Sequence, residues 1–378
     1  MTIRIPYLIT VLVSVLLIII GNKIAVNGRT IFQNVQQDVE KAKVQKVIGR
    51  FTQSENYDEH AFVLSDKIIF EAKITDGMRK GETVSAIQSF SGFATNVNAK
   101  EVAVGDYVLL IDIVEEWYFN GYIRTNKLLG LGIFFALSVL IFGGKKGFNT
   151  ILSLGLTCAS IFAVFIPAIL SGKNIYIMSL LVCAYTIAMT LFIVIGFNRK
   201  AFTAAVGCAS GIVVTAIITV IMDKLLILSG VVDESSKYLA SLPVENQINL
   251  RAIIFSGIII GAMGAVMDVA MSISSSLWEI KEKAREINFK ALLRSGLTIG
   301  RDIMGTMANT LILAYIGSSL SVVLILSVYS NSLLSLFNSE MIVVEILQAL
   351  AGSLGILFSM PLTALFCSII YLKKNKTA

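Results

Sequence analysis

An aspartate lies inside a long apolar stretch of this chain, at a position where a charge is costly. The stretch is Gly257–Glu279, with the sequence GIIIGAMGAVMDVAMSISSSLWE, and Asp268 stands near its middle. It is long enough to cross a bilayer, where an ionised carboxylate costs about 2.5–3.5 kcal/mol on insertion scales. Because loss of water favours the neutral form of a carboxyl group, such a residue can exchange a proton or a cation near neutral pH.

Small and polar residues accompany Asp268 at intervals of three or four positions, which places them on one face of a helix. They are Gly257, Gly261, Gly264, Ser272 and Ser275. The glycines predict close packing with another helix, and the polar end predicts a side turned away from lipid. Two interpretations of the aspartate are open. It is either a proton or cation relay in a transporter, or a protonated structural carboxyl group that hydrogen-bonds a neighbouring helix.

A second polar face occurs in IGRDIMGTMANTLILAYIGS, where Asp302, Thr306 and Asn309 share one side of a helix. The helices with the two faces follow each other in the chain and run antiparallel, so we expect them to be neighbours. Asn309 would then be able to hydrogen-bond Asp268. The alternative for Asn309 is a plain packing hydrogen bond between helices, a common role of buried amides in membranes.

The composition identifies the environment of these helices. Hydrophobic residues make up 56% of the 378 residues, charged residues only 15%, and the mean hydropathy is +0.80. A soluble domain is nearer a quarter charged, so the chain is predicted to be an integral membrane protein with the lipid bilayer as its first partner. The net charge of +6 comes from residues at the ends of apolar runs, which indicates membrane topology and not nucleic-acid binding.

The sequence lacks the motifs of several common enzyme classes. GxxxxGK[ST], HExxH and GxSxG do not occur, so we expect no nucleotide site and no enzymatic activity. His60 is the only histidine, which leaves no histidine-based metal site, and no cofactor is predicted. The four cysteines all fall inside predicted spans and are expected to be packing residues.

The pattern of apolar runs divides the chain into three parts. Residues 1–26 are expected to form a signal-anchor helix that is not cleaved, with a cleaved signal peptide as the alternative. Residues 27–126 form a β-rich extracytoplasmic domain, a small barrel or sandwich, in which Thr30–Lys46 is a short helix or a lead-in. Residues 127–378 form a multi-span domain. The predicted strands are Lys67–Ile74, Thr83–Phe90, Val102–Glu115 and Trp117–Ile123.

About eight runs are long and apolar enough to span a membrane. They are Tyr7–Ile20, Leu128–Gly144, Phe148–Leu170, Ile175–Phe197, Ala201–Met222, the stretch around Asp268, Ile303–Val328 and Ile342–Leu372. If the N-terminus is cytoplasmic, every inner segment is basic, including the lysine-rich tail. We therefore predict an α-helical polytopic membrane protein with both ends cytoplasmic. The charged segment Glu279–Arg301 would contain an amphipathic helix on the inner surface.

In GAMGAVMDVAMSISSSLWEI and GRDIMGTMANTLILAYIGS the sequence resembles the YibE/F family of bacterial multi-span membrane proteins. The resemblance extends from about Leu128 to the C-terminus and weakly into the β-rich segment. It implies a protein of the bacterial plasma membrane with several spans after an N-terminal extracytoplasmic domain, and it implies no mechanism. A looser likeness links the membrane aspartate and the Thr/Asn helix to accessory membrane subunits of the Sec translocon and related proton-driven permeases, from which the span count differs.

Two functions follow from these observations. The first is a component of a secondary permease or exporter, in which Asp268 binds the coupling proton or cation and Ser272, Thr306 and Asn309 line the path. The second is a non-transporting scaffold or accessory protein whose outer β-rich domain binds a partner. A second membrane protein or further copies of the chain are candidate partners.

Overall fold

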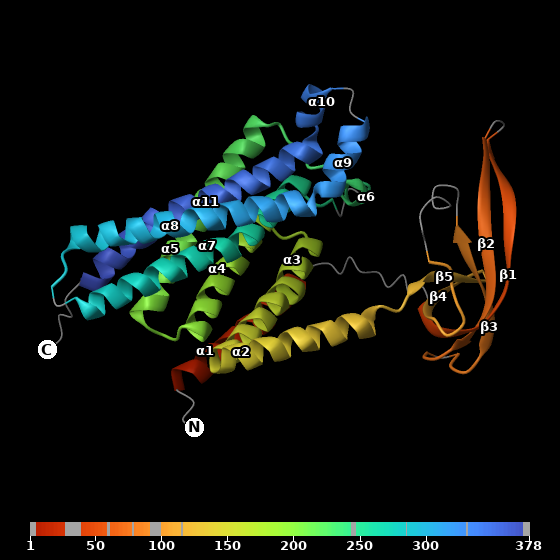
Figure 1. The fold of residues 1–378 in the computed structure, drawn as a ribbon, viewed down its shortest axis with the longest axis horizontal. Coiled ribbons are helices and arrows are strands. Elements are labelled where there is room, and N and C mark those ends of the chain that lie inside the picture. The colour runs from red at the N-terminus through yellow and green to blue at the C-terminus, as the bar shows by residue number, and fades with distance from the viewer. Residues whose placement is uncertain are drawn as a thin grey trace. The chain divides into compact units, whose positions relative to one another are not determined.

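The computed structural model describes residues 5–26, 39–58, 61–77, 79–90, 100–114, 116–242, 247–284, 286–329 and 332–372 (Figure 1). The chain forms two compact units. One is Phe32–Ser138, and the other combines Met1–Ile31 with Val139–Ala378. His60 and the lysine-rich tail after Leu372 lie outside the described residues.

A small closed barrel makes up most of the first unit. Its strands are β1 (Val39–Asp58), β2 (Ala61–Ile74), β3 (Thr83–Phe90), β4 (Tyr107–Ile113) and β5 (Glu116–Tyr122). Around the barrel they follow the order β1, β2, β3, β5, β4, and only the pair β3 and β5 is parallel. Alternate side chains such as Val44, Phe70 and Leu110 fill the interior. The four predicted strands are confirmed, with the barrel as the architecture that they form.

The expectation of a short helix or a lead-in at Thr30–Lys46 is wrong for its described part, which lies in strand β1; residues 30–38 lie outside the described residues. In the structure β1 begins at Val39 and pairs with both β2 and β4. The physical reason is a weak alternation: Ala42 and Val44 point into the barrel, while Lys41 and Lys43 point to solvent. Only two apolar residues carry this pattern, and neighbouring strands on both sides supply the remaining stability.

The helices of the chain are α1 (Ile5–Val26), α2 (Thr125–Ser160), a π-helix (Ile161–Phe165), α3 (Ile166–Leu170), α4 (Ile175–Val194), α5 (Arg199–Leu225), α6 (Glu234–Ala240), α7 (Leu250–Lys283), α8 (Phe289–Ser318), α9 (Leu320–Tyr329), α10 (Leu333–Phe337) and α11 (Glu340–Leu372). Within the described residues, six helical runs are long and apolar enough to cross a membrane. This supports the membrane assignment, whereas the count of about eight spans stays a prediction.

Two predicted spans, Leu128–Gly144 and Phe148–Leu170, fall in one helical run that is interrupted at a glycine. Gly144 has φ 53° and ψ −127°, a conformation that other residues rarely adopt. Just beyond it, a side chain on Gly147 would collide with the carbonyl group of Val139, so the chain turns back sharply at this point. The break thus lies at the predicted boundary between the two spans.

The charged segment Glu279–Arg301 does not form a separate surface helix. Its beginning belongs to the last turns of α7, and its second half belongs to α8, which starts at Phe289. The predicted span Ile303–Val328 is likewise divided between α8 and α9 near Ser319. Asn288 caps the start of α8 by accepting a hydrogen bond from the Ala291 amide, and this local signal decides where the helix begins.

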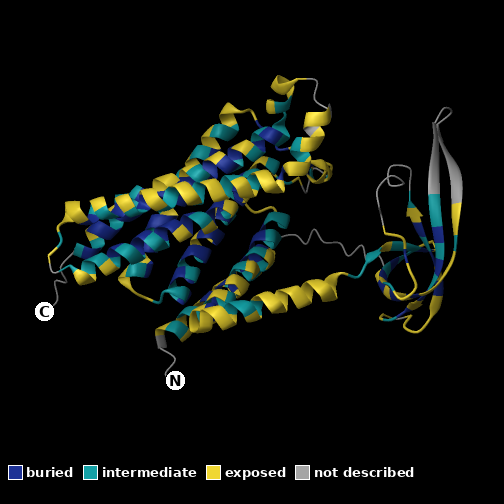
Figure 2. Ribbon diagram, in the orientation of Figure 1, coloured by how far each residue is buried: buried dark blue, intermediate teal, exposed yellow. Residues whose placement is uncertain are grey.

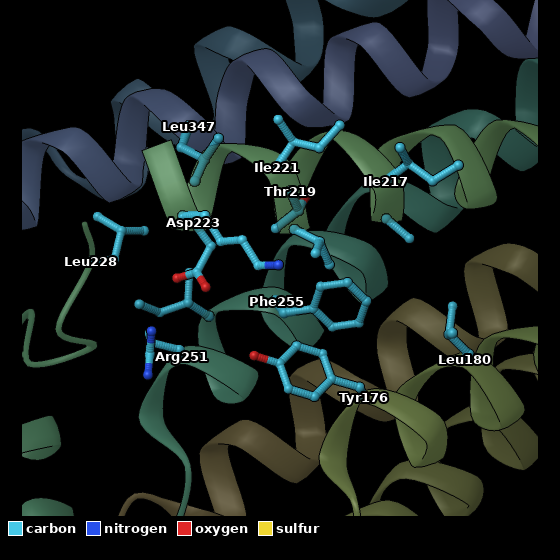
Figure 3. Close-up of a pocket in the computed structure, with 14 residues that line it drawn as sticks. Tyr176, Leu180, Ile217, Thr219, Ile221, Asp223, Leu228, Arg251, Phe255 and Leu347 are labelled. Atoms are coloured by element: carbon cyan, nitrogen blue, oxygen red, sulfur yellow. The ribbon is translucent and has the colours of Figure 1, made fainter. Parts of the chain in front are cut away.

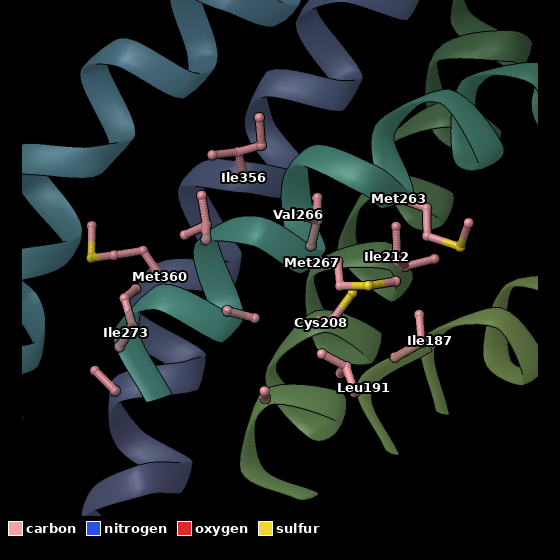
Figure 4. Close-up of a cluster of buried hydrophobic side chains, with 14 of the residues drawn as sticks. Ile187, Leu191, Cys208, Ile212, Met263, Val266, Met267, Ile273, Ile356 and Met360 are labelled. Atoms are coloured by element: carbon pink, nitrogen blue, oxygen red, sulfur yellow. The ribbon is translucent and has the colours of Figure 1, made fainter. Parts of the chain in front are cut away.

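The core of the second unit is formed by α4, α5, α7, α8 and α11. Figure 4 shows Cys208 of α5, Val266 and Met267 of α7, and Met360 of α11 in one buried cluster. Residues of this kind exclude both water and lipid from the centre of the unit.

Helices α5 and α11 approach each other most closely through small residues, in a contact that we call the α5–α11 seam. Its residues are Gly207, Gly211 and Thr215 of α5 with Gly355, Ser359 and Thr363 of α11. A side chain on Gly207 would collide with Thr363, and one on Gly355 would collide with Thr215. Small residues at intervals of four allow two backbones to meet at such short range, as in other membrane helix pairs.

Candidate functional site

Helix α7 positions Asp268 on the side opposite the core. The helix is capped by Asn249, whose side chain accepts a hydrogen bond from the Ala252 amide. Ala262, Val266, Ala270 and other residues of the buried side face α5, α8 and α11. The predicted small and polar face lies on the other side: Gly257, Gly261, Gly264 and Asp268 are exposed in the isolated chain, and Ser272 and Ser275 are half-buried.

Helix α8 shows the same division between a buried and an exposed side. Leu292, Gly296 and Gly300 are buried, whereas Asp302, Thr306 and Asn309 are all exposed (Figure 2). The Thr306 hydroxyl donates a hydrogen bond to the carbonyl of Ile303 within the same helix, 2.9 Å away. The polar faces of α7 and α8 therefore both lie outside the core, and we call the two together the outward polar face.

Contacts between α7 and α8 fix the level at which the two helices face each other. A side chain on Gly300 would lie 3.3 Å from Ile273, and one on Gly261 would lie 2.6 Å from the Tyr315 hydroxyl. Residue numbers rise along α8 as they fall along α7, so the helices are antiparallel neighbours, as expected. Asp268 lies between these two contacts and thus at the level of the middle of α8, where Thr306 and Asn309 lie.

Asp268 has no partner in the part of the chain that the structure describes. Its carboxylate forms neither a hydrogen bond nor an ion pair there, and the hydrogen bond expected from Asn309 is not formed. Both side chains are exposed in the isolated chain and do not lie in the buried contact between α7 and α8. Asp302 and Arg301, adjacent in sequence, also form no ion pair with each other or with other described residues.

The glycines of α7 differ in what surrounds them. A side chain on Gly257 or Gly264 would meet open space, whereas Gly261 leaves room for the Tyr315 hydroxyl. Close packing at Gly257 and Gly264 is therefore not provided by any described residue, and their predicted packing role would require another protein. Within the chain, the close helix packing through small residues that was predicted for α7 occurs instead in the α5–α11 seam.

Three buried hydroxyl groups form a cluster that the sequence pattern does not predict. Thr203 of α5, Ser274 of α7 and Tyr371 of α11 lie within 2.7–2.9 Å of one another, and Ser274 also donates to the carbonyl of Lys200. The cluster joins three helices at the end of the unit where α5 begins. Ser274 belongs to the same serine run as Ser272 and Ser275, but it points into the core because of its position on the helix.

The described residues offer little to a metal ion. No three His, Cys, Asp or Glu side chains among them are grouped as metal ligands. Cys183, Cys208 and Cys367 are buried and Cys158 is exposed, all with free thiols. The chemistry available at the outward polar face is therefore that of carboxyl, amide and hydroxyl groups.

A comparison with known protein families identifies the family to which the chain is similar. The family model described as "YibE/F-like protein" matches residues 131–373, which include the α7 and α8 faces and the α5–α11 seam. No curated protein and no solved structure matches the chain.

Proposed function

The chain belongs to the YibE/F-like family, and from this premise we propose that it is the membrane component of a secondary permease or exporter. In this proposal Asp268 binds the coupling proton or cation. Ser272, Thr306 and Asn309 lie along the path of the transported species, and Asp302 lies at its cytoplasmic mouth in the predicted orientation.

One observation carries the proposal: Asp268 is exposed near the middle of an apolar helix, without a partner among the described residues. A carboxyl group that only held helices together would hydrogen-bond a neighbouring helix of its own chain. An unmatched carboxyl group is costly in lipid, whether neutral or charged. A second membrane protein or a further copy of the chain would cover the outward polar face and enclose Asp268 in a watered path.

Proton flux in proteoliposomes tests this role. Wild type, Asp268→Asn and Glu279→Gln are reconstituted at equal density, with a pH-sensitive dye inside and an imposed proton gradient. Asparagine keeps the size and hydrogen-bonding capacity of aspartate but cannot exchange a proton. Glu279 lies on the same helix near its charged end, where its weak ion pair with Lys283 spans 4.0 Å, and serves as the matched control.

We expect gradient-driven proton movement in wild type and in Glu279→Gln, and its loss in Asp268→Asn. Equal flux in Asp268→Asn and wild type would exclude Asp268 as the coupling group. Circular dichroism and size-exclusion profiles that match between the variants would show that a lost signal does not come from a lost fold.

A scaffold function is the second candidate, and it is favoured by the turn after β4. Val114 is 91% exposed and has φ 55°, a left-handed conformation that is rare for a β-branched residue. Ile113 beside it is 50% exposed, so an apolar patch projects from the barrel. The change Val114→Asp in the full chain would then remove a co-purifying partner, as would deletion of residues 27–124, while Asp268→Asn would leave that partner bound.

A further inference from the structure

A cavity of about 590 Å³ lies between α4, α5 and α7, with one wall residue from α11 (Figure 3). Its floor is buried, since Thr219, Leu228 and Phe255 are all 5% exposed or less. Its side walls include Ile217 and Ile221, which are about half exposed on the outer side of α5. An apolar cavity that opens sideways from a membrane helix adjoins the hydrocarbon of the bilayer, so an acyl chain is its natural occupant.

Charged and hydroxyl groups gather at one end of this cavity. Asp223 and Lys224 lie near the end of α5, Arg251 near the start of α7, and Tyr176 near the start of α4. Figure 3 shows the Tyr176 hydroxyl directed toward the side on which Asp223 and Arg251 lie. Because all three helices begin or end here, this end of the cavity is expected at the level of the lipid headgroups, where tyrosine and basic residues are common.

The three charged side chains are available to a ligand. Asp223, Lys224 and Arg251 form no ion pair with each other or with any other residue in the described ranges. Two cations suit a phosphate group, and the planar guanidinium of Arg251 can donate two parallel hydrogen bonds to it. A single carboxylate beside them suits a primary ammonium group. The combination of apolar cavity, phosphate site and ammonium site matches one class of bilayer molecule.

We propose that this cavity binds one phospholipid with a primary amine headgroup. The phosphate lies on Arg251 and Lys224, the ammonium group on Asp223, and one acyl chain against Phe255. A phosphoglycerol headgroup offers no cation to Asp223, and a choline headgroup has no N–H group with which to donate a hydrogen bond. The cavity therefore discriminates between headgroups through Asp223 and holds all phospholipids through Arg251.

Native mass spectrometry of the purified full chain tests the proposal. The protein is equilibrated with dioleoyl phosphatidylethanolamine, phosphatidylglycerol and phosphatidylcholine in equal amounts, so that only the headgroup differs. We expect one retained phosphatidylethanolamine, with a preference of about fivefold or more over each of the other two lipids. Equal retention of the three lipids by wild type would overturn the proposal.

Two variants and a control assign the preference to the cavity. Asp223→Asn is expected to keep one lipid and lose the preference for the amine, and Arg251→Gln is expected to lower retention of all three lipids. Lys237→Gln changes an exposed lysine on α6 and is expected to behave as wild type. An unchanged preference in Asp223→Asn, with the same melting temperature as wild type, would contradict the assignment of the amine to Asp223. A loss of preference in Lys237→Gln would place the lipid site elsewhere.

Discussion

The α5–α11 seam and the face of α7 around Asp268 are built from the same residue types and serve opposite purposes. Both carry glycines and hydroxyl residues at intervals of three or four. In the seam every such residue meets a partner across the contact, as Gly211 does with Ser359 and Gly355. On α7, Gly257 and Gly264 meet open space, and Asp268 has no partner among the described residues. A small-residue face thus marks where a helix can be approached closely, and the neighbouring element decides whether it becomes core or surface.

Replacement of Gly211 by valine tests the first half of this comparison and should have the largest effect on stability. A Cβ at this position would lie 2.7 Å from the Ser359 Cβ and 3.0 Å from the Gly355 carbonyl oxygen, so the backbones must separate. We expect a loss of about 1–3 kcal/mol or more, seen as a lower melting temperature in detergent.

The same substitution at Gly264 is the matched control on the outward polar face. Gly264→Val adds the same side chain to a membrane helix where nothing lies within reach of a Cβ. Its melting temperature should stay close to that of wild type, because surface substitutions usually change stability by no more than about 0.5 kcal/mol. Equal destabilisation by the two variants would show that the two faces do not differ as described.

Some features of this structure could be predicted from the sequence. The strand Thr83–Phe90 was predicted to the residue, because Val84 and Ala86 alternate with polar residues and a turn with Gly and Asp precedes it. The grouping of the α7 face rests on helical periodicity, which alone fixes which positions share a side.

The sequence does not predict whether that face of α7 points toward the protein core or away from it. On α7 the buried side and the outer side are both apolar or small, and lipid and protein core are equally apolar, so no contrast in polarity distinguishes them. The seam and the hydroxyl cluster depend on which helices meet, as Thr203, Ser274 and Tyr371 come from three distant parts of the chain. Strand β1 was missed for a similar reason, because its partners and not its own residues determine its conformation.

A substitution in the hydroxyl cluster is expected to lower the stability by an intermediate amount. In Tyr371→Phe the ring stays, with its edge-to-face contact to Trp278 at 5.0 Å, while Thr203 and Ser274 lose a shared partner. Interhelical hydrogen bonds in membrane proteins average about 0.6 kcal/mol, so we expect a loss of about 0.5–1.5 kcal/mol. The measurement is urea-induced or thermal unfolding of wild type, Tyr371→Phe and the exposed control Tyr238→Phe. A change in Tyr238→Phe as large as in Tyr371→Phe would count against a specific role of the cluster.

Asp106 of the barrel shows how the same side chain as Asp268 behaves when water and a cation are present. Its carboxylate accepts hydrogen bonds from the Lys100 ammonium at 2.8 and 2.9 Å and from the Ala103 amide, and these hold its pKa below the usual value of 3.8. The Lys100 ammonium in turn has a pKa above its usual value of 10.5, mainly because of the hydrogen bond to Asp106. The carboxylate therefore stabilises the fold above about pH 4 and loses this effect as the pH falls through its lowered pKa, while the lysine contribution is lost only as the pH rises through its raised pKa.

The change Asp106→Asn should consequently have the smallest effect on stability, because the Lys100 side chain of the pair is 63% exposed to solvent, while that of Asp106 is 22% exposed. We expect a slightly lower unfolding midpoint than wild type at pH 7, and a difference that shrinks as the pH falls below 3.8 and the carboxyl group takes up a proton. Fluorescence of the buried Trp117 reports on the barrel alone if Trp278, the other tryptophan, is replaced by phenylalanine in both proteins. A difference that persists unchanged at pH 2 would mean that the ion pair is not its cause. The comparison with Asp268 would then need a different reference carboxylate.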